Sequence, residues 1–94
     1  MKGTGDEMYL AEVKGNVVAT TKDQKLVGTK LLIVQPMDPT FTPYGNPLIA
    51  VDTVGAGFRD RVIIATGGSA RTIFAEGTPV DAAIVAIIDT VELY

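Results

Sequence analysis

The sequence predicts an all-β fold with one short helix: a small five-stranded barrel of OB-like, Greek-key type. Short apolar, β-branched segments recur along the 94 residues, and turns rich in glycine and proline separate them. No segment between them is long enough for the helical crossovers that usually join parallel strands. Several short strands with such turns, in a chain of one domain's length, are typical of a small barrel.

The first strand is predicted to follow a lead-in of residues 1–7, which is polar and rich in glycine and is expected to be flexible. Residues 8–94 are expected to form one domain. Apolar or small residues then occupy every second position: Tyr9, Ala11, Val13, Gly15, Val17 and Ala19. This period of two indicates a strand with one buried face. A glycine in its middle, Gly15, indicates a bend or bulge.

The second and third strands are predicted on either side of a proline-rich connection. After a polar loop at residues 20–25, Leu31–Val34 is a short apolar run that we expect Pro36 to end. Residues 35–47 contain four of the five prolines, which predicts a long loop. Leu48–Val51 is the third predicted strand.

The last third of the chain is predicted to hold two more strands and the one short helix. Arg61–Thr66 is the fourth strand. Ser69 is a candidate cap for a short helix over Ala70–Phe74, which the turn Gly77–Pro79 follows. Ala82–Val91 is predicted as the fifth strand, because its β-branched content outweighs its alanines.

The composition argues against several classes of function. Eight Lys and Arg against eleven Asp and Glu give a net charge of −3, so the chain lacks the basic footprint expected of a nucleic-acid-binding protein. The chain has no His and no Cys, which removes the usual general base, thiol chemistry and zinc–thiolate sites; we expect no cofactor and no metal. No apolar run is long enough to span a membrane and no secretory signal is evident, so we expect a cytoplasmic protein.

Two glycine-rich loops are the candidate binding elements: Gly55-Ala56-Gly57 and Gly67-Gly68-Ser69. Consecutive backbone N–H groups in such loops can form an anion nest, and the second loop has Arg71 close by. For both loops we favour the other interpretation, tight turns between strands in which glycine supplies a positive φ.

Four acidic residues border the predicted strands: Asp52, Asp60, Asp81 and Asp89. Two of them could in principle serve as acid and base. No nucleophile-activating partner accompanies them, so we favour turn capping and ion pairs with Arg59, Arg61 and Arg71. No catalytic residue is predicted.

Three predicted strand segments are apolar on both faces: Leu31–Val34, Val62–Ala65 and Ala82–Ile88. A small barrel has one interior, so alternate side chains must point outward and leave an apolar patch. Such a patch usually marks an interface. The sequence therefore predicts a homo-oligomer that closes as a ring or a dimer.

Six motifs occur in a characteristic order: Leu10–Val18, Lys30–Val34, Ala50–Gly57, Gly67–Arg71, Pro79–Asp81 and Ile87–Val91. In this order and spacing, from about Met8 to Val91, the chain resembles the EutN/CcmL family. These are the pentameric vertex proteins of bacterial microcompartment shells, including those of carboxysomes.

The resemblance implies an OB-like barrel assembled as a homopentamer at the fivefold vertices of a polyhedral shell, where hexameric shell proteins meet. The function would be structural and not enzymatic, inside a cytoplasmic microcompartment, with a narrow axial pore as a second feature. Seven residues are then candidates for the pore or the subunit interface: Gly55, Ala56, Gly57, Gly67, Gly68, Ser69 and Arg71.

Two other functions remain open from the residues alone. An OB-type binding module for nucleic acid or oligosaccharide would need a basic or aromatic groove, whereas the six aromatic residues here are scattered and the net charge is negative. A small enzyme would have to use a glycine-rich loop and paired acids without an evident base.

Overall fold

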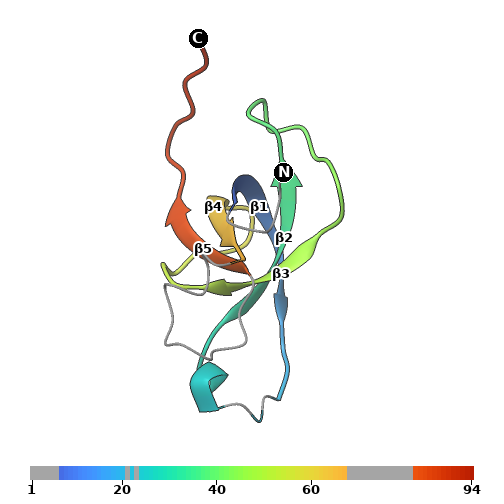
Figure 1. Ribbon diagram of the computed structural model, residues 1–94, viewed down its shortest axis with the longest axis vertical. Coiled ribbons are helices and arrows are strands. Elements are labelled where there is room, and N and C mark those ends of the chain that lie inside the picture. Colours follow the sequence, from blue (N-terminus) through green and yellow to red (C-terminus); the bar gives the residue numbers. More distant parts are fainter. Residues whose placement is uncertain (1–6, 21, 23, 68–81) are drawn as a thin grey trace.

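The computed structural model describes residues 7–20, 22, 24–67 and 82–94, and within them five strands close into a barrel (Figure 1). The strands follow one another around the barrel in the order β1-β2-β3-β5-β4; β3 and β5 run parallel, and the other neighbours run antiparallel. Their bounds are β1 Met8–Val17, β2 Leu31–Met37, β3 Leu48–Asp52, β4 Arg61–Thr66 and β5 Ala82–Ile87. The predicted five-stranded barrel is confirmed, and the OB-like label stays a prediction.

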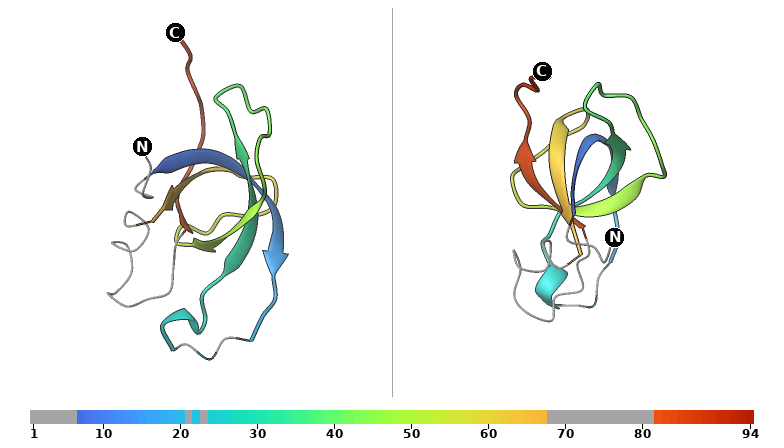
Figure 2. Two further views of the ribbon diagram at one scale, coloured as in Figure 1. Left: turned by 45° about the vertical axis from the view of Figure 1, so that its right-hand side comes forward. Right: turned by 45° about the horizontal axis from the view of Figure 1, so that its top comes forward.

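The interior of the barrel is filled by alternate residues of every strand. Its buried side chains are Ala11, Val13, Leu32, Val34, Ala50, Ala56, Val62, Ile64, Ala82 and Ile84. Small and β-branched side chains dominate this set, as the narrow interior of a small barrel requires. The two views of Figure 2 show the strands curving around this core.

A bulge in β1 changes which of its residues face inward. Val13 lies opposite Val34 and Gly15 lies opposite Ile33, so the register shifts between Val13 and Gly15. The bulge predicted at Gly15 is confirmed. The prediction that Gly15 and Val17 share the buried face of Val13 is wrong, because one extra residue reverses the alternation beyond it.

The first two strands end at different residues from those predicted, and the pairing of neighbouring strands explains why. Strand β1 stops at Val17, not Ala19, because its partner β2 begins opposite it. Strand β2 continues through Pro36 to Met37. The Pro36 carbonyl accepts the Tyr44 N–H at 3.1 Å on the side away from β1, and the paired part of β3 begins only opposite Val34. No strand therefore needs the N–H that proline lacks.

Strand β5 ends at Ile87, four residues before the predicted Val91. The Ile88 N–H still donates to the Arg61 carbonyl at 2.7 Å. Arg61 is the first residue of β4, so the chain beyond Ile88 has no further strand residue of β4 to pair with. The β-branched residues that follow carry strand propensity, but a strand needs a partner.

The predicted polar loop at residues 20–25 ends in a short 3₁₀ helix, η1, at Gln24–Leu26. Leu26 packs against a second buried cluster that contains Val51 and Ala83, on the strand positions that alternate with the core. Part of the outward apolar surface is therefore covered within the subunit. The predicted helix over 70–74 lies outside the described residues.

The loop between β2 and β3 is held together by one carboxylate. Asp38 Oδ1 accepts the Thr40 hydroxyl at 2.6 Å and the backbone N–H groups of Thr40 and Thr42 at 2.9 and 3.0 Å. These hydrogen bonds favour the charged carboxylate and lower the pKa of Asp38 below its ordinary value. The Thr40 hydroxyl has the largest effect, followed by the Thr42 N–H. This loop carries Phe41 to Arg61, whose guanidinium carbon lies 3.8 Å from the ring centroid.

Candidate functional site

The loop that joins β3 to β4 folds around the carboxylate of Asp52. Asp52 Oδ1 accepts the N–H groups of Val54, Gly55 and Ala56 at 3.0, 3.1 and 3.2 Å. Gly55 sits at a positive φ of 83°, which a side chain would strain. The first glycine-rich loop is therefore a nest, but its anion is the chain's own carboxylate, so these N–H groups are not free for an external anion.

Lys30, which immediately precedes β2, contacts the same loop. Its ammonium lies 3.7 Å from Asp52 Oδ2 and donates to the Ala56 carbonyl at 2.6 Å. The Asp52 side chain is only 3% exposed, so this ion pair is well shielded on the acidic side. The prediction that Asp52 caps a turn is confirmed, but among the residues that the structure describes its cationic partner is Lys30, and neither Arg59 nor Arg61.

Asp60, at the end of the loop that precedes β4, connects the loop to the bulge of β1 by hydrogen bonds. Its Oδ2 accepts the Gly57 N–H at 2.8 Å, and its carbonyl accepts the Val13 N–H at 2.9 Å. Arg59, at a φ of 72°, donates its own N–H to the Val13 carbonyl at 2.9 Å. Bulge and loop thus satisfy each other's backbone groups, which explains why the strand is irregular at this point.

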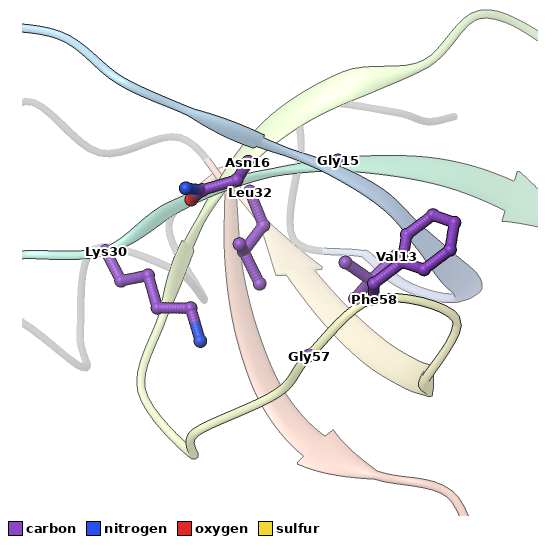
Figure 3. Close-up of a pocket in the computed structure, with 7 residues that line it drawn as sticks. All are labelled: Val13, Gly15, Asn16, Lys30, Leu32, Gly57 and Phe58. Carbon is purple, nitrogen blue, oxygen red and sulfur yellow. The ribbon is translucent and has the colours of Figure 1, made fainter.

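A cavity of about 300 Å³ opens beside this loop (Figure 3). Strands β1 and β2 and the Gly57–Phe58 corner line it, and the Lys30 amine extends along one side. Most of the lining is apolar, and Phe58 is 69% exposed at its rim. Of the residues that line the cavity, sequence analysis predicted only Gly57 as a candidate site residue, and it did not predict the cavity itself.

The lysine had a detectable signal in the sequence. Leu31 lies opposite Val51, and the Asp52 N–H donates to the Lys30 carbonyl at 2.9 Å. Pairing the two predicted strands antiparallel would have brought Lys30 beside Asp52. Phe58 had no such signal, because a lone aromatic after a glycine turn fits core or surface equally well.

The second glycine-rich loop is described only at its start. Gly67 follows β4 in a turn, with a φ of 63°. Gly68, Ser69 and Arg71 lie outside the described residues, as do Asp81 and the turn over 77–79. Asp89 is exposed.

The outward apolar side chains predicted for the barrel are partly exposed. On the strands, Ile49 and Ile87 are 56% and 41% exposed, and Ile33 and Ile63 are half-buried. Ala56 lies in the core and Gly57 is half-buried, so of the three predicted glycine-loop residues Gly55 is the exposed one. Among the described residues there is no cluster of three or more acidic, His or Cys side chains that could hold a metal ion. Within the residues that the structure describes, no helix is long and apolar enough to cross a membrane.

Comparison with known proteins finds one family along nearly the whole chain. The sequence model described as "Ethanolamine utilisation protein EutN/carboxysome" matches residues 8–89. The bacterial microcompartment shell vertex protein GrpN of Rhodospirillum rubrum is 46% identical over 86 residues, which cover 90% of this chain and 97% of GrpN. The carboxysome shell vertex protein CcmL of Nostoc is 46% identical over 88 residues, covering 92% of this chain and 87% of CcmL.

The fold is also that of a solved shell protein. The structure described as a GrpN pentameric microcompartment shell protein from Rhodospirillum rubrum superposes with a TM-score of 0.81 at 45% identity. The match covers 92% of this chain and 98% of the other.

Proposed function

The chain belongs to the EutN/carboxysome family, and we propose on this basis that it is a structural shell protein of a bacterial microcompartment. Five copies form a ring that caps a fivefold vertex of the polyhedral shell. The observation that carries this function is the likeness, along nearly the whole chain, to a pentameric shell protein. The outward Ile49 and Ile87 supply apolar surface that a ring can bury.

The function is structural and not enzymatic. Asp52 and Asp60, the acids that flank the described loop, are engaged by backbone N–H groups of that same loop. The Lys30 amine beside the cavity already donates to a backbone carbonyl. These engagements also weigh against an OB-type binding module for nucleic acid or oligosaccharide, which would need free polar groups in its groove.

The partners of the ring are proposed to be hexameric shell proteins. Sixfold tiles alone form a flat layer, and a fivefold unit introduces the curvature that closes a shell. We place the two glycine-rich loops near the subunit interface or the fivefold axis, where a narrow pore would lie. A ring repeats each charged group five times, so one Arg71 per subunit would create a strong local field there.

The proposed role is tested by shell closure. Hexameric shell proteins produced together with this chain are expected to form closed polyhedra in electron micrographs. The same hexamers without the chain should leave open sheets, tubes or shells with gaps at the corners. If the chain fails to associate with the hexamers and closure does not depend on it, the vertex role is wrong.

A further inference from the structure

The last seven residues, 88–94, form an arm that leaves the barrel. The Ile88 N–H bonds to the Arg61 carbonyl, after which the chain runs away from the strands (Figures 1 and 2). Leu93 is 61% exposed and Tyr94 is fully exposed. The one side-chain hydrogen bond described for the arm stays within it, from Tyr94 Oη to Glu92 Oε1 at 3.4 Å. Two large apolar side chains are thus held in solvent on an extended segment, which is unfavourable for an isolated subunit.

The cavity beside Phe58 is a surface of complementary character. Val13 and Leu32 line its floor but are only 1% and 2% exposed, so the ring of Phe58 at the rim, 69% exposed, is the main apolar surface that it offers to a partner. Figure 3 shows the end of β5, and the arm beyond it, leading away from this cavity. The arm of the same subunit therefore does not cover Phe58 or the cavity.

A second copy of this chain fits the cavity better than an unrelated partner. A ring is built from heterologous contacts, in which one surface of a subunit meets a different surface of the next. An arm and a cavity are such a pair, and both repeat in every subunit. Their charges also match, because the arm carries Asp89 and Glu92 while the exposed Arg59 follows Phe58 at the rim of the cavity; Lys30 is already paired with Asp52.

The dimensions are adequate for such a contact. Seven residues in extended conformation reach roughly 23 Å, enough to cross from one small barrel onto its neighbour. A buried aromatic side chain removes roughly 150–250 Å² from water. Tyr94 on one subunit and Phe58 on the other would each supply roughly a fifth to a third of the ~800 Å² per partner that stable interfaces bury, so other contacts of the ring must supply the rest.

We propose that residues 88–94 of one subunit dock against the Val13–Leu32–Phe58 cavity of the next subunit around the ring. Leu93 and Tyr94 cover Phe58, and the acidic arm residues Asp89 and Glu92 lie near Arg59 of that next subunit. This inference rests on the proposed pentamer and names the segment that joins its subunits. Because each arm reaches forward by one position, five arms close the ring.

The absence of cysteine from the chain permits a direct test by cross-linking. A double variant with Phe58→Cys and Leu93→Cys should form disulfides between subunits on mild oxidation. Each subunit contributes one arm and one cavity, so a non-reducing denaturing gel is expected to show a ladder ending at five linked chains. Both side chains are exposed, so neither change disturbs the core.

The matched control is the pair Tyr44→Cys and Leu93→Cys. Tyr44 is an aromatic residue that is 48% exposed, but its N–H bonds to the Pro36 carbonyl, near the end of β2 that lies away from Lys30 and the cavity. This control should give no ladder. Equal ladders from both pairs would indicate random collision and overturn the proposal. A test pair that stays unlinked, or links only within one chain, in a protein of pentameric mass would also overturn it. A wild-type protein without pentameric mass would instead contradict the proposed assembly itself.

Discussion

Replacing Asp52 with alanine is expected to lower the free energy of unfolding by about 3 kcal/mol. A hydrogen bond to a charged group is worth roughly 1.5–3 kcal/mol, and the three N–H groups here share one acceptor, Asp52 Oδ1, so their contributions do not add. Ala56 is fully buried, so its N–H would be left without an acceptor in the core. Urea titration followed by circular dichroism, at one fixed protein concentration, measures the change.

The control for this variant is Glu7→Gln, which removes the same charge from an exposed position outside the arm and keeps an acceptor for the Tyr9 hydroxyl. Its free energy of unfolding should stay within roughly 0.5 kcal/mol of wild type. A loss of equal size in both variants would mean that net charge, and not the Asp52 nest, sets the stability. No loss in Asp52→Ala would show that the loop does not depend on its carboxylate.

Replacing Ile64 with alanine is expected to cost about 4 kcal/mol, at the upper part of the range for large-to-small changes in a core. Ile64 is fully buried in β4, and its strand partners are Tyr9 of β1 and Ile84 of β5. A small barrel has few other core residues that could move into the void. The loss is measured as the shift of the urea midpoint.

Ile49→Ala is the matched substitution on the outside of the barrel. Ile49 is 56% exposed, so for the dissociated chain the loss should be below about 1 kcal/mol. Both variants replace an isoleucine with alanine, so the difference between their losses of unfolding free energy distinguishes a core position from an outward apolar one. Similar losses in both variants would contradict the assignment of Ile64 to the interior.

The alternation of apolar residues was enough to predict the barrel, because a period of two survives in each short strand. It failed where one residue interrupts it. Because the bulge in β1 adds one residue after Val13, Gly15 and Val17 lie on the opposite face of the strand from Val13. The predicted ends of two strands were also wrong, because a strand ends where its partner strand stops. Strand β2 continues through Pro36, and β5 ends before Ile88.

The candidate loop was predicted by composition, but its chemistry was not. Glycine spacing cannot tell an empty anion nest from one filled by a neighbouring carboxylate, and the difference lies in the position of the Asp52 side chain and in Lys30, which immediately precedes β2. The Phe58 cavity was missed because it is made by three segments that meet only in the folded barrel. Local patterns carry no information on such a meeting.

The central claim is that these barrels join into a ring of five, and native mass spectrometry tests it most directly. The account predicts one dominant species with five times the 9.9 kDa mass of a single chain. That species should persist on moderate dilution, since the buried contacts are apolar. A folded protein that keeps the mass of one chain, or of a pair of chains, would contradict the account.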